Sequence, residues 1–196
     1  MKTIHFPTFL LTELLASILF LTGYAQELAK NKDFPLHNAA QEGNLEVVKS
    51  LVEKGADINA KDNNGKTPIF DAVLSGNVEV VKYFVEKGAD VNAKNSYGNT
   101  PLFDVVAYYG HTHEYSEVAE YLVEKGANVN AKNDYGETIL FTASSNNLEV
   151  VKYLVEKGAS VNVKDNTKDN GEIPLFHAVR WNRLEVVKYF VENGAD

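Results

Sequence analysis

The chain has 196 residues, 44% of them hydrophobic, a formal net charge of −8 at neutral pH and no cysteine. These values fit one ordinary soluble domain with enough apolar material for a core, and they exclude a disulfide framework and a thiolate metal site. No run of five basic residues occurs. This argues against a nucleic-acid binder and against a polybasic membrane patch, because both need clustered cations.

The N-terminal segment has the pattern of a secretory signal peptide. Lys2 provides a short positive region, residues 14–22 are apolar, and Gly23 and Ala25 place small residues before a cleavage point. We therefore expect residues 1–25 to be a signal peptide, residues 26–32 to be a short N-terminal lead, and the mature chain to be periplasmic or secreted. The alternative is a membrane anchor formed by an uncleaved N-terminal segment. Against it, the apolar stretch of 16 residues contains Glu13 and is shorter than the about 20 residues that a spanning helix needs.

The rest of the chain is an internal repeat. The dipeptide Gly-Ala recurs at Gly55, Gly88, Gly126, Gly158 and Gly194, with spacings of 33, 38, 32 and 36 residues. A basic period of 33, with one insertion of five, one deletion of one and one insertion of three, accounts for these spacings. The expected repeat domain covers residues 33–196, with units at about 33–64, 65–97, 98–135, 136–170 and 171–196.

Each unit carries the start and stop signals of two short helices. In the second unit, Thr67 is predicted to cap a first helix with its hydroxyl, and Pro68 fits the first turn of that helix. Gly76 suits the left-handed residue that follows it, and Asn77 is predicted to cap a second helix that ends at Gly88. Helices of about nine residues are unstable alone in water, so neighbouring units are expected to stack.

These units resemble ankyrin repeats. The sequences G-K-T-P-I-F-D-A at residues 65–72 and G-A-D-V-N at residues 88–92 follow the pattern of that family, and the resemblance covers residues 33–196. It implies an all-α fold, an ankyrin-repeat solenoid of helix–turn–helix units with short hairpin-like loops, about 4.7 repeats long.

The units also depart from the family pattern. The histidine that ties the turn together in ankyrin repeats is kept as His37 alone. Phenylalanine replaces it in the other four units, at Phe70, Phe103, Phe141 and Phe176. These units are therefore expected to rely more on aromatic packing. In two units asparagine replaces the glycine between the helices, at Asn146 or Asn147 and at Asn182, and asparagine tolerates the left-handed backbone of that place.

No catalytic constellation is recognisable in the sequence, and we assign no catalytic residue, cofactor or metal ligand. A glycine-rich phosphate loop, a nucleophile elbow and a His-Glu-x-x-His helix are all absent from it. The cluster of ligand-type residues His111, His113 and Glu114 lies in the five-residue insertion of the third unit. Two or three such residues on a loop are more often solvated side chains than a metal site. His177 is interpreted as a groove or packing residue rather than a base, and no enzyme activity is expected.

The resemblance implies a surface for a protein partner. In ankyrin proteins the loop tips and the exposed side of the first helix form a concave groove that binds partners. The candidate partner-binding residues at these positions are Asn64, Lys66, Ser96, Tyr97, Tyr108, Asp134, Tyr135, Asn170, Arg180 and Trp181. Tyr, Trp and Arg dominate binding hot spots; the alternative is that these aromatics cover apolar neighbours at the rim. Asp71 and Asp104, inside the first helices, are expected to extend an acidic strip.

The final predicted helix, at residues 184–192, repeats the apolar pattern of the internal ones with no following unit in the sequence. It is expected to be covered by self-association, by the partner, or by repeats missing from a truncated gene. The expected function is a non-enzymatic protein–protein interaction module, without nucleic-acid binding or a membrane span after cleavage. Its groove would bind a protein partner in the periplasm or extracellular space. The alternatives are an inhibitor or immunity-type protein that blocks an exported enzyme or toxin, a secreted effector and, ranked last, a metal-dependent enzyme.

Overall fold

A computed structural model describes residues 34–109, 113–145, 148–166 and 171–196. Within these ranges the chain forms ten helices and no strand. Their bounds are α2 (Pro35–Gln41), α3 (Leu45–Glu53), α4 (Pro68–Ser75), α5 (Val78–Glu86), α6 (Pro101–Tyr109), α7 (His113–Glu124), α8 (Ile139–Ala143), α9 (Leu148–Glu156), α10 (Pro174–Arg180) and α11 (Leu184–Glu192). None of the described helices is long and apolar enough to cross a membrane.

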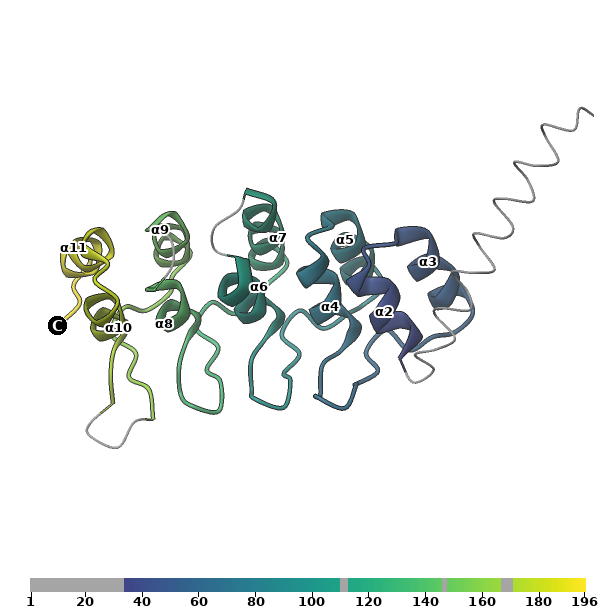
Figure 1. Cartoon of the computed structure of the whole chain (residues 1–196), viewed down its shortest axis with the longest axis horizontal. Helices are drawn as coiled ribbons and strands as arrows, with labels where there is room; N and C mark the ends of the chain where they lie inside the picture. The colour runs from purple at the N-terminus through teal and green to yellow at the C-terminus, as the bar shows by residue number, and fades with distance from the viewer. Residues whose placement is uncertain (1–33, 110–112, 146–147, 167–170) are drawn as a thin grey trace, which may run out of the picture.

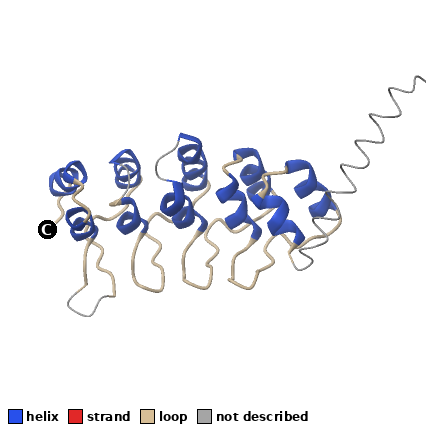
Figure 2. Ribbon diagram, in the orientation of Figure 1, coloured by secondary structure: helices blue, strands red, loops and turns tan. Residues whose placement is uncertain are grey.

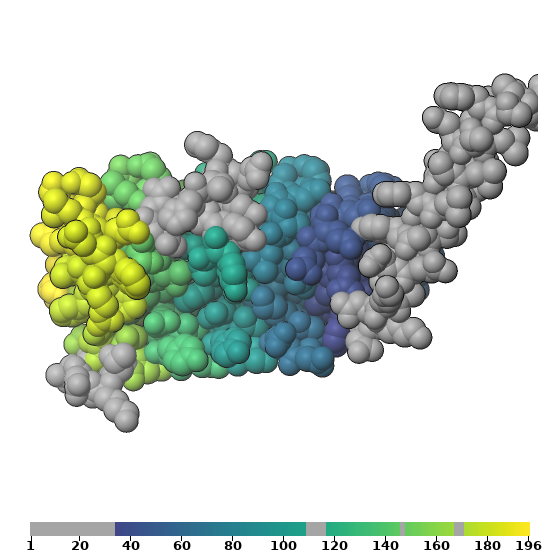
Figure 3. Space-filling view, in the orientation of Figure 1, coloured from purple at the N-terminus to yellow at the C-terminus, as the bar shows by residue number. Residues whose placement is uncertain are grey.

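The helices lie in two rows, and hairpin loops form a third layer (Figure 1). The second helices of the units, α3, α5, α7, α9 and α11, make one row, and the first helices, α2, α4, α6, α8 and α10, make the next. Each first helix contacts the second helix of its own unit and the first helix of the neighbouring unit. Figure 2 shows the hairpins projecting as loops beyond the first helices. The chain is therefore an all-α repeat solenoid, as predicted, and its units succeed one another along the long axis (Figure 3).

The first helices are short, and those of the units before the last are largely buried. In α4, Ile69, Phe70 and Val73 are fully buried, and the helix ends at Gly76, whose φ of 72° confirms the predicted left-handed stop. The predicted hydroxyl cap of Thr67 is wrong. Thr67 has the extended backbone of a capping residue, but its buried hydroxyl has no hydrogen-bond partner. The amide of Phe70, which that hydroxyl would cap, donates instead to the Thr67 carbonyl oxygen at 3.0 Å.

The second helices are amphipathic, and asparagine side chains cap α3 and α5. The Asn77 side-chain oxygen accepts hydrogen bonds from the amides of Glu79 (3.1 Å) and Val80 (3.4 Å), as predicted. Val80 and Phe84 are fully buried on the inner side of α5. The outer side carries an exposed Glu79–Lys82 pair at 2.8 Å, and exposed pairs of this kind add little to stability. Burial of the apolar side against neighbouring units therefore holds these nine-residue helices.

A column of asparagines joins each repeat to the next. The side-chain amide of each donates to the carbonyl oxygen of the glycine that ends the next second helix, at 2.8–3.2 Å. The side-chain oxygen of each accepts a backbone N–H just beyond that glycine. The four asparagines are Asn59, Asn92, Asn130 and Asn162. These two-way bonds fix the offset between consecutive units.

The five-residue insertion of the third unit contributes to a longer helix. Helix α7 has 12 residues, whereas α5 has nine. His113 and Glu114 begin this helix, so the expectation that they lie on a loop is wrong; His111 lies outside the described residues. Extra residues ahead of a helix leave its downstream positions in register, and Val118 and Leu122 are fully buried. Figure 1 shows α7 on the side of the stack opposite the hairpins.

The last unit differs from the internal ones in its exposed apolar surface. Phe70, Phe103 and Phe141 are buried, as aromatic packing requires, but Phe176 is 53% exposed, which contradicts the expectation for this unit. Val179, Leu184 and Val191 are exposed as well. The reason is that no described repeat packs beyond α10 and α11. Asn182 has a φ of 54°, as predicted for its left-handed position, whereas Asn146 and Asn147 lie outside the described residues.

Candidate partner-binding face and repeat junctions

The hairpins are bonded directly to one another. The Ser96 amide donates to the Asn64 carbonyl oxygen (2.8 Å), the Asp134 amide to the Tyr97 carbonyl oxygen (3.0 Å), and the Asn166 amide to the Tyr135 carbonyl oxygen (2.8 Å). We call the tips of these hairpins, together with the exposed side chains of the first helices, the hairpin face. Because backbone hydrogen bonds join the hairpins of neighbouring units, the side chains of this face project from a backbone of fixed geometry.

Each hairpin is closed by an aspartate or asparagine at the same position. The Asn95 side-chain oxygen accepts the amides of Tyr97 (2.9 Å) and Asn99 (3.1 Å), and the Asn133 oxygen accepts those of Tyr135 and Glu137 at 3.0 Å each. These bonds are the local turn chemistry of short polar side chains. They hold Tyr97 and Tyr135 at matching places on adjacent tips.

The predicted partner-binding aromatics are largely solvent-exposed. Tyr97, Tyr108, Tyr135 and Trp181 are 58–67% exposed. Asn64, Ser96, Asp134 and Arg180 are exposed too, while Asn170 lies outside the described residues. Arg180 forms an ion pair of 2.7 Å with Glu172. A hollow of about 570 Å³ beside Tyr135 is lined by Asp134, Tyr135, Glu137, Asp165 and Asn166.

Lys66 is engaged inside the stack rather than free on the hairpin face. Its Nζ lies 2.9 Å from Asp104 Oδ2 in the next unit and 5.7 Å from the centre of the Phe70 ring. Burial alone would lower the pKa of Lys66, but the hydrogen bond and charge of Asp104 outweigh it and raise that pKa above its usual value. Asp104 is 4% exposed, so it does not extend an exposed acidic strip as expected.

Asp71 occupies the same place as Asp104 one unit earlier. Burial raises the pKa of Asp71 from its ordinary 3.8 to about 6, against the opposing charges of His37 and Lys66. His37 Nε2 is hydrogen-bonded to the Lys66 carbonyl oxygen at 3.0 Å, which is the turn-tying role that the resemblance assigns to this histidine. The first three units thus carry a polar network of His37, Lys66, Asp71 and Asp104 inside the stack.

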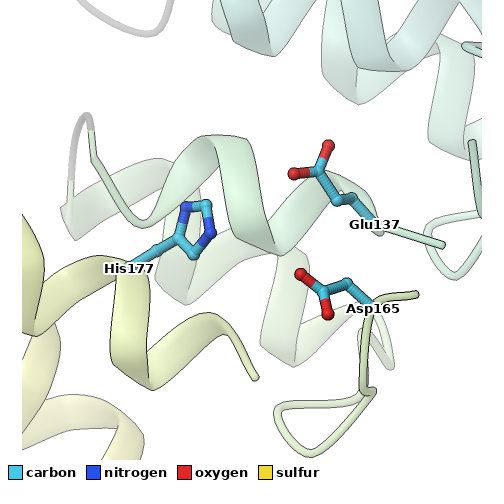
Figure 4. A group of neighbouring side chains, drawn as sticks. All are labelled: Glu137, Asp165 and His177. Carbon is cyan, nitrogen blue, oxygen red and sulfur yellow. The ribbon is translucent and has the colours of Figure 1, made fainter. Parts of the chain in front are cut away.

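A second group of titratable side chains lies between the fourth and fifth units. Glu137, Asp165 and His177 each offer one ligand-type atom, and these atoms all lie within 4.8 Å of one another. Figure 4 shows the three side chains pointing toward one another from three separate segments. The His177 ring packs edge-on against Phe141, with ring centres 5.2 Å apart, and its Nε2 lies 3.7 Å from Glu172 Oε2.

The two groups occupy equivalent positions in different repeats. Counting the glycine that opens a unit as its first residue, each group joins the second residue of one unit to the seventh residue of the next. The residue that closes the intervening hairpin is the third member. We call these sets the 66–104 junction (Lys66, Asn95 and Asp104), the 99–142 junction (Asn99, Asn133 and Thr142) and the 137–177 junction (Glu137, Asp165 and His177).

The sequence does not predict these junctions. It predicts Lys66 as a partner-binding residue and His177 as a groove or packing residue. Their neighbours across the junction are 38 and 40 residues away, so local patterns give no signal. The repeat period is the signal that could have predicted them, because stacked units bring the same pair of repeat positions together in consecutive units.

Comparison with known families agrees with this architecture. A family model described as ankyrin repeats in three copies matches residues 10–95 and 90–165, and one described as ankyrin repeats in many copies matches residues 142–191. A search among curated proteins finds no match. Since the first of these models covers well over half of the sequence in the repeat pattern that the helices display, the chain belongs to the ankyrin-repeat family.

Proposed function

We propose that the chain is an exported, non-enzymatic protein-binding module that holds its partner on the hairpin face. Ankyrin repeats generally mediate protein–protein interaction and are typically not enzymes. The observation that carries the finer proposal is the exposure of Tyr97, Tyr135, Tyr108 and Trp181, each more than half exposed on a scaffold with a buried core.

Exposed aromatic side chains supply binding free energy when a partner buries them. A tyrosine or tryptophan that becomes buried at an interface contributes large contact area for only two side-chain torsions, and truncation of such an anchor costs about 2 kcal/mol or more. Tyr97 and Tyr135 have their backbones tied by the hairpin ladder. Little backbone entropy is therefore lost when a partner binds them, which supports a preorganised site.

A capture experiment tests the hairpin face. Protein recovered from the native envelope fraction and medium is compared for the wild type, a Tyr97→Ala/Tyr135→Ala/Trp181→Ala variant, and a control that replaces three exposed glutamates of the second helices. The control is Glu79→Ala/Glu149→Ala/Glu185→Ala. We expect the wild type and the control to recover the same partner, and the aromatic variant to lose it. Equal recovery by all three would show that the hairpin face is not the site.

Export is supported by the N-terminal pattern of Lys2, the apolar residues 14–22 and the small residues before position 26. We expect the exported protein to begin at Gln26. Mass determination of the protein purified from the envelope and medium tests this cleavage. A chain that keeps residues 1–25 and stays with the membrane fraction would support the anchored alternative.

The acidic composition favours a basic partner, which suits an inhibitor or immunity-type role as the second candidate. The net charge is −8, and charge complementarity mainly accelerates association and makes it salt-sensitive. An inhibitor is expected to bind one exported enzyme or toxin tightly and to block it at equimolar ratio. Binding to several partners that is insensitive to salt would favour a general scaffold.

Self-association is proposed through the exposed apolar side chains of α10 and α11. Phe176, Val179, Leu184 and Val191 supply the apolar surface for it. Sedimentation of the purified chain over a range of concentrations tests this contact. A strictly monomeric chain at all concentrations rules it out.

A further inference from the structure

The 137–177 junction combines ligand types that bind transition metals. Glu137 and Asp165 each offer a carboxylate oxygen and His177 a ring nitrogen, all within 4.8 Å of one another. Zinc binds such atoms at about 2.0–2.2 Å, which places tetrahedral ligands roughly 3.5 Å apart. A closure of roughly 1 Å, within reach of side-chain rotation, would bring the three atoms into the first coordination sphere of one ion.

The charges of the junction favour a bound cation. At the 66–104 junction the ammonium of Lys66 neutralises buried Asp104 at 2.9 Å. At the 137–177 junction the residue equivalent to Lys66 is Glu137, and Asp165 is a buried aspartate where the other two junctions have Asn95 and Asn133. The carboxylates of Glu137 and Asp165 therefore converge on one imidazole, and a third carboxylate, that of Glu172, lies 3.7 Å from His177 Nε2 and is paired with Arg180. Two carboxylate charges close together at a partly buried site repel each other, and a bound divalent cation offsets this repulsion.

Neighbouring groups orient these side chains. The side-chain amide of Asn133 donates to Glu137 Oε2 at 3.0 Å, and Asp165 Oδ1 accepts the Glu172 amide at 2.8 Å. The edge-on contact with Phe141 fixes the plane of the His177 ring. Hydrogen bonds to ligating carboxylates and a defined ring orientation are the supports that protein metal sites generally have.

From this arrangement we propose that Glu137, Asp165 and His177 bind one divalent transition-metal ion of the zinc type, which clips the fourth repeat to the fifth. The imidazole favours zinc and its neighbours in the transition series over calcium and magnesium, which prefer sites made entirely of oxygen ligands. The hollow beside Glu137 and Asp165 leaves space for water to complete the coordination. This site goes beyond the proposed binding function and does not depend on it.

The ligands come from separate parts of the stack. Glu137 precedes α8, Asp165 lies in the hairpin after α9, and His177 is on α10. A bound ion therefore stabilises the folded C-terminal half, because the unfolded chain does not hold these three residues together. We expect zinc at 100 times its dissociation constant to raise the melting temperature by several degrees.

The repeats themselves supply matched control variants. Asp165→Asn creates the residue found in the equivalent hairpins at Asn95 and Asn133, where the side-chain oxygen closes the hairpin without a carboxylate. His177→Thr creates the residue that the preceding unit has at Thr142. Both variants are expected to fold. A circular dichroism spectrum and a metal-free melting temperature close to those of the wild type check this.

The test is titration calorimetry with zinc chloride on the purified chain, freed of metal and without an affinity tag, together with the absorption spectrum of its cobalt complex. We expect one equivalent of zinc, visible cobalt bands, and at least tenfold weaker zinc binding for Asp165→Asn and His177→Thr. A His111→Ala/His113→Ala variant, which removes the other His-containing cluster of the sequence, is expected to bind as the wild type does.

Three outcomes would overturn the proposal. The first is a wild-type chain that binds no zinc and shows no cobalt bands. The second is zinc binding that survives His177→Thr unchanged, or that His111→Ala/His113→Ala abolishes. The third is calcium binding that is as tight as zinc binding, with neither affinity changed by His177→Thr. This result would indicate that the ions are attracted by acidic surface groups alone.

Discussion

The 66–104 and 137–177 junctions are built on the same backbone frame but carry opposite chemistry. The first is a closed ion pair, with Lys66 Nζ 2.9 Å from a nearly fully buried Asp104. The second gathers two carboxylates and an imidazole within 4.8 Å beside an open hollow. Stacking thus brings the second position of one unit to the seventh position of the next, and the side chains at those positions decide whether the junction stabilises the stack or forms a candidate ligand site.

The largest expected effect comes from breaking the ion pair. Lys66→Ala leaves the carboxylate of Asp104 buried without its cation, and the loss of one member of a buried pair costs about 3 kcal/mol or more. Equilibrium unfolding in urea measures it. The control is Lys66→Asn/Asp104→Thr, which installs the uncharged side chains of the 99–142 junction and should recover most of the loss. A Lys66→Ala chain as stable as the wild type would show that the pair is dispensable.

The next effect concerns Asp71, which faces the 66–104 junction. Its folded-state pKa of about 6 lies above its ordinary value of 3.8, so between these two pH values the folded chain holds a proton that the unfolded chain has released. Asp71 therefore lowers stability progressively as pH rises from about 4 to about 6, and the full penalty persists at pH 7. Asp71→Asn should raise stability at pH 7 by on the order of 2 kcal/mol.

Unfolding free energies of the wild type and Asp71→Asn across pH 4 to 7 check this assignment. The two curves should converge near pH 4 and separate above it. A constant offset between them would mean that hydrogen bonding of the amide, and not the charge of Asp71, causes the difference.

A transplant sharpens the comparison between junctions. Lys66→Glu/Asn95→Asp/Asp104→His gives the 66–104 junction the ligand set of the 137–177 junction, and it leaves in place Asn133, whose amide donates to Glu137 Oε2. If the frame is equivalent, this variant binds a second equivalent of zinc, and its melting temperature rises further with zinc than that of the wild type. Calorimetric stoichiometry measures the outcome. One equivalent alone would mean that the supports around His177 are required besides the three ligands.

The smallest expected effect comes from replacing a threonine hydroxyl that does not cap its helix. The Thr67 and Thr138 hydroxyls are buried and have no hydrogen-bond partner. Thr67→Val should raise stability by about 1 kcal/mol, because an unpaired buried hydroxyl is replaced by a methyl group of similar shape. Thr138→Val provides the same test in the C-terminal half. A loss of stability in both variants would restore the capping role that the sequence predicts.

Much of the fold was predictable from the residues. The spacing of Gly-Ala dipeptides and the succession of Pro68, Gly76 and Asn77 predict two helices and their ends, and the structure has them. These predictions succeed because caps and left-handed stops depend on local backbone chemistry. The failures, at Thr67, His113 and Phe176, occur where a competing backbone bond, an extended helix or the lack of a described unit packed beyond α10 decides the outcome.

The candidate site was predictable in part. The sequence indicated exposed aromatics at the tips, and Tyr97, Tyr135 and Trp181 are exposed in the structure. Their role in binding a partner stays a prediction. The sequence did not predict the ion pair of Lys66 with Asp104, because the two residues are 38 positions apart and no local pattern near either residue indicates its partner.

The sequence by itself determined the repeat, its period and the local chemistry of its turns, since each depends on residues within one unit. The tertiary structure alone decided which side chains meet between units. Which side chains meet depends on the offset between consecutive repeats. Helix packing and the hydrogen bonds of asparagines such as Asn92 to the next repeat set this offset. This offset brings Glu137 and Asp165 to His177 and Lys66 to Asp104, and so gives two copies of one frame different chemistry.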